Sequence, residues 1–237
     1  MCGRFSLTWN LNELQSRFGF ITEWSALEPK YNIAPTDPVL TVINDGRRRA
    51  EIMRWGLVPL WAKDTKIGSR MINAVCETVA TKPAFRSAYK KRRCLVLANG
   101  FYEWKKVGKR RTPIYLPLKS GDAMAVAGLW EVWKSPAGEY VRSCTVVTTT
   151  PNSLLKPVHN RMPVILSEES ESLWLAPLTE APKVLAPLLM PAPPELMAAH
   201  VVSDCVNSIR SQGPQCIVPL MELPEEYSTY GEGRLFN

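Results

Sequence analysis

A cysteine directly follows the initial methionine, and this position holds the most distinctive chemical group of the sequence. A small second residue normally allows Met1 to be removed, which leaves Cys2 with a free α-amine next to its thiol. The amine, with a pKa near ~8, is partly neutral at physiological pH, and the thiol, near ~8.5, is a second nucleophile. An aldehyde attacked by the amine forms an imine, on which the thiol closes a five-membered thiazolidine. By position alone, however, an inert second residue is the commoner case.

Two titratable residues stand within apolar, strand-like stretches. Glu103 is the only acid between Lys82 and Arg111, and two aromatic residues flank it. Burial would raise the pKa of its carboxyl and the neighbouring cations would lower it, so Glu103 is a candidate general acid or base. A salt bridge to a cation of the same stretch is the plain alternative. His159, taken by itself, is more often a structural histidine than a catalyst.

Positive charge is concentrated in one part of the chain, which carries a net charge of +7. Between Lys82 and Arg111 there are eleven lysines and arginines and one acid, whereas acidic residues outnumber basic ones in the remainder. Such a basic belt favours polyanions, of which nucleic acid is the commonest in cells. The alternative is a solvated surface without a partner.

Composition and spacing exclude several classes of protein. The 237 residues are 46% hydrophobic and 22% charged, which indicates a folded core and, in our interpretation, one domain over residues 1–237. Six cysteines without a C-x-x-C pair and only two histidines predict no metal site, and we expect no cofactor. No apolar run reaches the ~18 residues of a membrane helix, and no signal peptide is visible. We therefore expect a cytoplasmic protein with buried thiols, near the nucleoid if the source is bacterial. As a separate expectation, the protein is a monomer.

The pattern of apolar and turn residues predicts an α+β fold dominated by antiparallel sheet. A helix is expected over residues 10–18, ended by Gly19, a basic helix from Pro83 to about Lys91, and a capped helix over residues 167–175. Asn44-Asp45-Gly46 joins two strands, 38–43 and 50–55, in a hairpin. Five later runs are predicted to form an antiparallel meander: 94–98, 101–106, 113–118, 123–133 and 140–149. The proline-rich run 181–194 is expected to be irregular.

Several ordered motifs carry a resemblance to a known family. They are Cys2-Gly3-Arg4-Phe5, Tyr31–Thr36, Trp55–Pro59, Met71–Thr78, Lys82–Arg86, Asn99–Lys106, Val158–Leu166, Val206-Asn207 and Gly213-Pro214. With these motifs the sequence closely resembles the SOS-response-associated peptidase (SRAP) family, whose members sense abasic sites in single-stranded DNA. The resemblance covers nearly the whole chain. It implies a single SRAP domain, with a mainly antiparallel sheet curled into a barrel-like fold and short flanking helices.

The resemblance also implies roles for four residues around the reacting carbon. Cys2 would crosslink to the ring-opened deoxyribose of an abasic site as a thiazolidine, and Asn73 would hold the sugar or its phosphate beside it. Glu103 would move protons during ring opening and imine formation. His159 would act as the second acid or base.

Further residues are implied as contacts to the DNA strand. Arg4 and Arg161 would bind phosphates, and Thr148 is a weaker candidate for a DNA contact. Asn73 would contact the DNA in addition to its role beside Cys2. Trp61 would stack on a base, an interaction that tolerates any sequence.

Two positions depart from the pattern of the family. Val75 stands where an arginine is common, which removes one expected phosphate contact. Asn160 stands where the family usually has aspartate after the histidine. A neutral amide cannot stabilise imidazolium as a carboxylate does, so we expect His159 to be less readily protonated here.

The resemblance thus implies a DNA-damage protein that binds single-stranded DNA at abasic sites and forms a covalent crosslink through Cys2, with lyase chemistry accessible through the imine. One alternative is a thiol peptidase or N-terminal nucleophile hydrolase acting through Cys2, whose simplest activity would be removal of its own Met1. Another is a non-covalent single-strand binder in which Cys2 is incidental.

Overall fold

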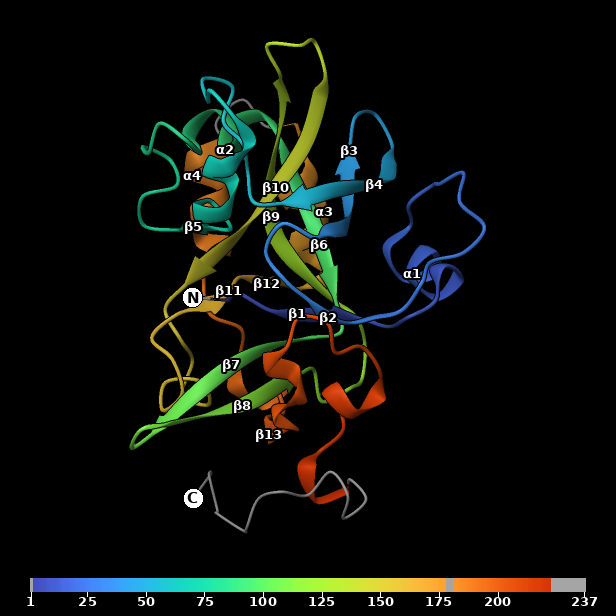
Figure 1. Cartoon of the computed structure of the whole chain (residues 1–237). Coiled ribbons are helices and arrows are strands. Elements are labelled where there is room, and N and C mark those ends of the chain that lie inside the picture. Colours follow the sequence, from blue (N-terminus) through green and yellow to red (C-terminus); the bar gives the residue numbers. More distant parts are fainter. Residues whose placement is uncertain (1, 178–180, 223–237) are drawn as a thin grey trace.

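A closed ring of five strands forms one half of the fold (Figure 1). The structure is a computed structural model that describes residues 2–177 and 181–222. Around the ring the order is β3 (Pro38–Asn44), β4 (Arg48–Trp55), β10 (Tyr140–Thr149), β9 (Met124–Lys134) and β6 (Arg93–Ala98), which pairs again with β3. The β4–β10 pairing is parallel and the other four are antiparallel. The predicted α+β fold with a barrel-like, mainly antiparallel sheet is confirmed.

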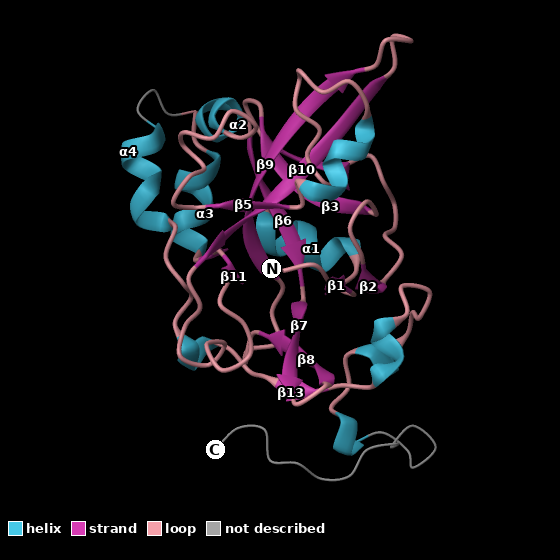
Figure 2. Cartoon of the chain, turned by 60° about the vertical axis from the view of Figure 1, so that its left-hand side comes forward, coloured by secondary structure: helices cyan, strands magenta, loops and turns pink. Residues whose placement is uncertain are grey.

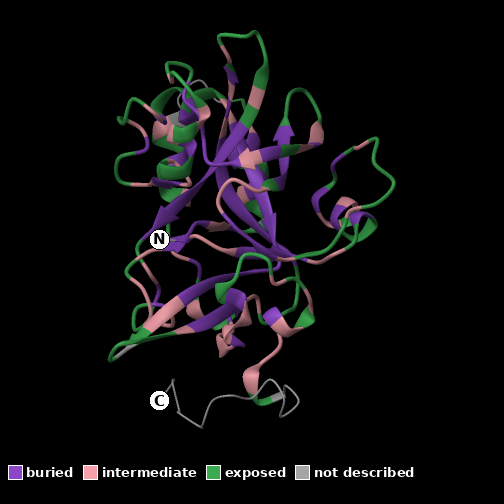
Figure 3. Cartoon of the chain, viewed as in Figure 1, coloured by how far each residue is buried: buried purple, intermediate pink, exposed green. Residues whose placement is uncertain are grey.

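The central barrel strand β6 is covered on both faces. Every residue of β6 is buried, and the barrel strands are buried along much of their length in Figure 3. On one side of β6 lies helix α3 (Glu168–Leu175), whose Trp174 donates its indole N–H to the carbonyl oxygen of Cys94 at 3.0 Å. Ser167 caps this helix, as the sequence predicted.

A second, open sheet lies next to the barrel in the order β13 (His200–Val201), β8 (Arg110–Pro117), β7 (Gly100–Val107), β1 (Phe5–Leu7) and β2 (Lys30–Ile33). The rings of Phe5 and Trp55 connect the two units edge to face, with centroids 4.9 Å apart. Three short strands lengthen the barrel: β5 (Asn73–Val75) is parallel to the end of β10, β11 (Met162–Pro163) is antiparallel to that end, and β12 (Ile165–Leu166) pairs with β9.

Local signals predicted the hairpin and two of the three helices well. Helix α1 (Leu11–Phe18) begins with a capping box at Asn10 and ends at Gly19, whose φ of +62° is left-handed. Helix α2 (Arg86–Lys91) starts later than predicted, because residues 83–85 form turns before it. The proline-rich run is not wholly irregular, since it contains the short helix α4 (Ala181–Leu185).

The predicted five-strand meander is wrong. Strand β6 pairs with β9 in the barrel, whereas β7 and β8 form a hairpin in the second sheet. The chain passes from the barrel to the second sheet at Asn99. Its backbone N–H donates to the Ser6 carbonyl oxygen at 2.8 Å, and its side-chain oxygen accepts from the Trp9 backbone N–H at 3.2 Å. These bonds to the β1 region direct the chain away from the barrel.

Two glycines make the loop after β4 possible, and this gives a stability prediction. Gly56 has φ +124°, and a Cβ there would lie 2.5 Å from the carbonyl oxygen of Gly68. We expect Gly56→Ala to destabilise the chain by about 1–3 kcal/mol, through a strained backbone and a collision with rigid backbone atoms. The expected fall in Tm is roughly 2–4 °C per kcal/mol.

Gly46→Ala is the matched control, because Gly46 has φ +115° but a Cβ added there would meet no atom within 4 Å. Gly46→Ala places an alanine at an unfavourable positive φ without a collision, so its Tm should fall less. Equal decreases in the Tm of the two variants would contradict the role given to the Gly56–Gly68 contact.

None of the helices in the described part of the chain has the length and apolar character needed to cross a bilayer.

Candidate functional site

Four separate segments bring Cys2, Asn73, Glu103 and His159 together where the two sheets meet. Asn73, the first residue of β5, donates its side-chain N–H to the carbonyl oxygen of Cys2 at 2.8 Å. The negative charge of Glu103, on β7, acts on the Cys2 thiol and raises its pKa. Glu103 Oε1 in turn lies 3.8 Å from Nδ1 of His159. We name these four residues the Cys2 cluster.

The Cys2 side chain is buried, with 2% of its surface exposed. Burial, and then the charge of Glu103, raise the pKa of its thiol well above the usual range. The sulfur is therefore a neutral thiol at physiological pH. A thiolate nucleophile is not preformed at this position.

The pKa values of Glu103 and His159 are shifted in opposite directions, in both cases mainly by burial. Burial raises the pKa of Glu103, which is 4% exposed, to about 7. Burial also lowers the pKa of His159. Both groups therefore favour their neutral forms more than usual, and the carboxyl of Glu103 can hold or release a proton near neutral pH.

The contacts of His159 include the backbone of Arg161, whose N–H donates to Nδ1 at 3.1 Å. Asn160, between them, is exposed. Because Asn160 stands where the family usually has aspartate, we expected His159 to be harder to protonate. In the structure the main cause of the lowered pKa of His159 is burial.

One buried polar atom of the Cys2 cluster and one beside it have no hydrogen-bond partner within the described residues. They are the side-chain carbonyl oxygen of Asn73 and the hydroxyl of Thr148. Strand β10 carries Thr148 directly opposite Val75 of the parallel strand β5. Because buried polar atoms are normally satisfied, these two groups are candidates to bind polar atoms of a ligand.

Arg161 lies at the edge of the same region and is engaged by protein atoms. Its two terminal nitrogens contact the carboxylate of Glu77 at 2.7 and 2.9 Å, and one of them also donates to the Thr148 carbonyl oxygen at 2.6 Å. Sequence reasoning missed Glu77. The residue stands in a quoted motif, but its partner lies 84 positions further along the chain.

Arg4 is not part of the Cys2 cluster. Its guanidinium donates to Asn32 Oδ1 at 2.6 Å and to the Val206 carbonyl oxygen at 2.7 Å, and it lies over the ring of Trp104. Successive side chains of a strand point to opposite faces, so Trp104 and Glu103 face opposite sides of β7. Arg4 therefore lies on the other face of this strand from Glu103.

Trp61 is 59% exposed and lines a shallow hollow of ≈ 310 Å³ together with Ala62, Lys63, Asp64 and Ile67. This lining includes no member of the Cys2 cluster. Its exposed ring is available to a partner.

The basic belt is divided between two places in the structure. One exposed group, with Arg86 and Lys90, belongs to α2, and the other, with Lys106 and Lys109, belongs to the β7–β8 hairpin. The N-terminal end of the chain lies between α2 and this hairpin in both Figure 1 and Figure 2. The two elements that carry these exposed cations therefore lie on either side of the N-terminal end of the chain in both views.

Two arginines of the belt are used by the protein itself. Arg93 is 6% exposed and donates to the backbone carbonyl oxygens of Tyr89 and Lys90 at 2.9 and 2.7 Å. Arg92 pairs with Glu131 at 2.7 Å. The charge count of the sequence therefore overstated the surface that is available to a polyanion.

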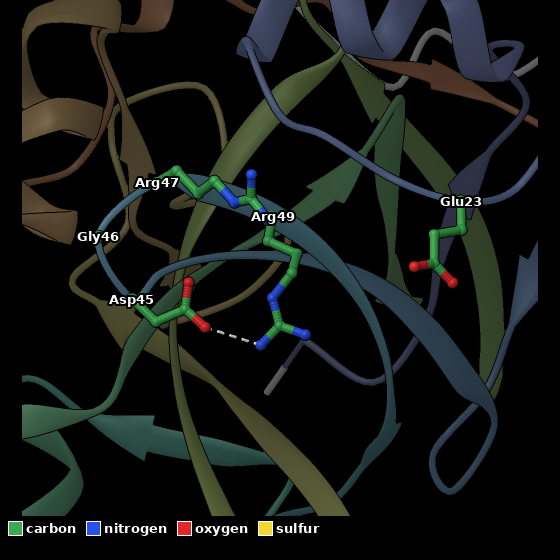
Figure 4. A pocket seen from close by; sticks show the side chains of 5 residues that line it. All are labelled: Glu23, Asp45, Gly46, Arg47 and Arg49. Carbon is green, nitrogen blue, oxygen red and sulfur yellow. Dashed lines mark hydrogen bonds and ion pairs between the residues drawn. The ribbon is translucent and has the colours of Figure 1, made fainter.

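Another hollow, of ≈ 630 Å³, lies at the β3–β4 turn (Figure 4). Glu23, Asp45, Gly46, Arg47 and Arg49 line it, and Arg49 pairs with Asp45 at 2.8 Å. It contains none of the predicted site residues. No group of three or more His, Cys, Asp or Glu side chains suited to a metal occurs within residues 2–177 and 181–222.

Comparison with known proteins adds three findings. The family model for SOS response associated peptidase (SRAP) matches residues 1–209. The abasic site processing protein YoqW of Bacillus subtilis (strain 168) is 44% identical over 222 residues, covering 92% of this chain and 99% of the relative. The abasic site processing protein HMCES of Mus musculus is 33% identical over 235 residues, covering 81% of this chain and 65% of the relative.

Among solved structures, a protein from Bacteroides thetaiotaomicron superimposes with a TM-score of 0.84 at 27% identity. The match covers 92% of this chain and 99% of that one. The arrangement of barrel and second sheet is thus shared with an experimentally determined structure.

Proposed function

The chain belongs to the SOS response associated peptidase (SRAP) family, and on this basis we propose that it processes abasic sites in single-stranded DNA by forming a covalent crosslink through Cys2. The observation that carries the proposal is the Cys2 cluster, in which a buried thiol lies within the electrostatic reach of a carboxyl with a pKa near 7. Relatives named as abasic site processing proteins support the choice of substrate.

The proposed reaction starts from the ring-opened aldehyde of the abasic deoxyribose. After removal of Met1, the α-amine of Cys2 attacks the aldehyde carbon, and loss of one water gives the imine. The thiol then adds across the C=N bond, its sulfur bonding to carbon and its proton passing to nitrogen. The product is a thiazolidine, formed with the release of a single water molecule.

Glu103 is suited to the proton transfers of this sequence. With a pKa near 7, its carboxylate can accept the proton that the attacking amine loses, and the protonated form can then deliver a proton to the departing hydroxyl. His159, 3.8 Å away, is the second group able to hold a proton. Asn73 fixes the backbone of Cys2 by its hydrogen bond and leaves a buried oxygen for the sugar.

The buried thiol gives the peptidase alternative less support. Attack on an amide requires a thiolate, whereas burial and the nearby carboxylate favour the neutral thiol of Cys2. In the crosslinking sequence the amine acts first, and the thiol adds to an electrophile that is already activated.

A crosslinking assay tests the proposal. We expect the purified protein to form a heat-stable adduct with a single strand that contains an abasic site. A strand with an abasic analogue that lacks the hydroxyl at C1′ is the control, because it cannot open to an aldehyde. Equal adduct with both strands, or with neither, would refute the proposed function.

The divided basic belt predicts salt-sensitive binding of undamaged single strands. Each phosphate neutralised in a single strand contributes about 0.7 to the slope of log affinity against log salt. The double variant Lys106→Ala/Lys109→Ala on the β7–β8 hairpin should therefore reduce the slope by about 1–1.5, with little dependence on base sequence. Fluorescence anisotropy at several salt concentrations measures this.

Lys134→Ala is the matched control, because Lys134 is also exposed but lies at the far end of β9, outside the belt. It should leave the slope unchanged. An identical slope for the double variant and the wild type would exclude the hairpin from the phosphate path.

A further inference from the structure

The family resemblance implies that Arg161 binds a backbone phosphate, yet in the structure a carboxylate of the same chain already holds its guanidinium. Nη1 and Nη2 contact Oε1 and Oε2 of Glu77 at 2.7 and 2.9 Å, a two-pronged arrangement. Arginine recognises phosphate oxygens by the same geometry. The carboxylate therefore occupies the edge of the guanidinium that a phosphate would use.

The surroundings leave Arg161 little freedom to serve both partners. Its side chain is 16% exposed, and Nη2 also donates to the Thr148 carbonyl oxygen at 2.6 Å. Glu77 is half exposed, and the preceding residue, Cys76, is fixed by a backbone hydrogen bond to Thr148 at 2.9 Å. The side chain of Glu77 is thus the partner that can turn away into solvent.

The ion pair persists over the whole working pH range. The hydrogen bonds from Arg161 lower the pKa of Glu77 to about 2. The carboxylate therefore stays charged between pH 5 and pH 9. Val75, two residues before Glu77 and at the end of β5, is apolar and therefore provides no second cation for a phosphate.

We propose that Glu77 sets the affinity of the protein for undamaged single strands, because its carboxylate occupies Arg161, at the edge of the Cys2 cluster, until a backbone phosphate replaces it. This inference rests on the proposed function. Every strand, damaged or not, must exchange a carboxylate for a phosphate at Arg161. Non-covalent binding is weakened by this exchange, and stable capture depends on the bond formed at Cys2.

The test is Glu77→Gln, which keeps the size of the side chain and removes its charge. Affinity for an undamaged oligonucleotide, measured by fluorescence anisotropy, should rise roughly 2–5-fold, the scale of one partly exposed ion pair. The rate of adduct formation at saturating abasic strand should stay within about 2-fold. Glu77→Ala should change the affinity in the same direction.

Two controls distinguish a local exchange from other causes. Glu139→Gln removes one exposed carboxylate at the far tip of the β9–β10 hairpin and should leave the affinity unchanged. In an Arg161→Ala background, Glu77→Gln should not change the affinity, because the guanidinium that the substitution would free is absent.

Several outcomes would overturn the proposal. Weaker binding by both Glu77 variants would mean that the carboxylate positions Arg161 instead of competing for it. An equal gain in Glu139→Gln would indicate a general effect of charge, and an undiminished gain in the Arg161→Ala background would place the effect elsewhere. Failure of the wild type to crosslink any abasic strand is a separate result, which rejects the proposed function itself.

Discussion

Cys2→Ala should abolish the heat-stable adduct with abasic single-stranded DNA, a loss of at least 100-fold in yield. Closure of a thiazolidine requires the sulfur, and an imine formed by the amine of alanine alone hydrolyses on denaturation. Non-covalent affinity for the strand should stay within about 3-fold, because the buried thiol is only 2% exposed and contributes little surface to a ligand. Denaturing gel electrophoresis after heating measures the adduct.

Cys76→Ala is the matched control for this result. Cys76 is a half-buried thiol that lies 3.9 Å from Nη2 of Arg161, next to the same region. Its replacement should preserve the adduct. An undiminished yield of stable adduct with Cys2→Ala would contradict the mechanism and would indicate a lysine as the reacting amine.

Glu103→Gln should slow crosslinking by ~10²–10⁴, the usual contribution of one acid–base step, while affinity for the strand changes only a few-fold. The amide keeps the shape of the side chain and loses the titratable proton. Because burial raises the pKa of Glu103 to about 7, the wild-type rate should increase as pH rises through 7 and the carboxylate forms. The variant should keep only the later increase near pH ~8, where the α-amine loses its proton.

Glu131→Gln is the control for this pH profile. Glu131 is another buried carboxylate, on β9, where it pairs with Arg92 outside the Cys2 cluster. Its variant should retain the inflection near pH 7. If single-turnover rates between pH 5 and pH 9 are the same in Glu103→Gln and the wild type, Glu103 has no part in the proton transfers.

The parts of the fold that short-range signals determine were predictable from the sequence. The capping box at Asn10 with Gly19 and the Asn44-Asp45-Gly46 turn act over three to five residues, and both elements formed as expected. Closure of the barrel depends on pairings between distant strands, such as β4 with β10. Periodicity carries no information on these partners, which is why a meander was predicted.

The candidate site shows the same limit. The chemistry of Cys2 and Glu103 made them candidates, and motifs typical of the family then implied their roles. Charge counting, however, treated Arg93 as surface, although backbone carbonyl oxygens bind it in the interior. The phosphate contact of Arg4 stays a prediction, and the structure adds a bond from its guanidinium to the Val206 carbonyl oxygen, 202 positions away. Such long-range partners depend on the tertiary fold, and neither residue type nor spacing indicates them.

The most direct test of the account is peptide mapping of the adduct by mass spectrometry. Trypsin cleaves after Arg4, so the expected product is the peptide Cys2-Gly3-Arg4, without Met1, joined to the abasic nucleotide remnant with the loss of one water. This result would place the bond on the aminothiol of Cys2. A remnant on a peptide whose modified residue is a lysine, or on a peptide that still carries Met1, would contradict the account.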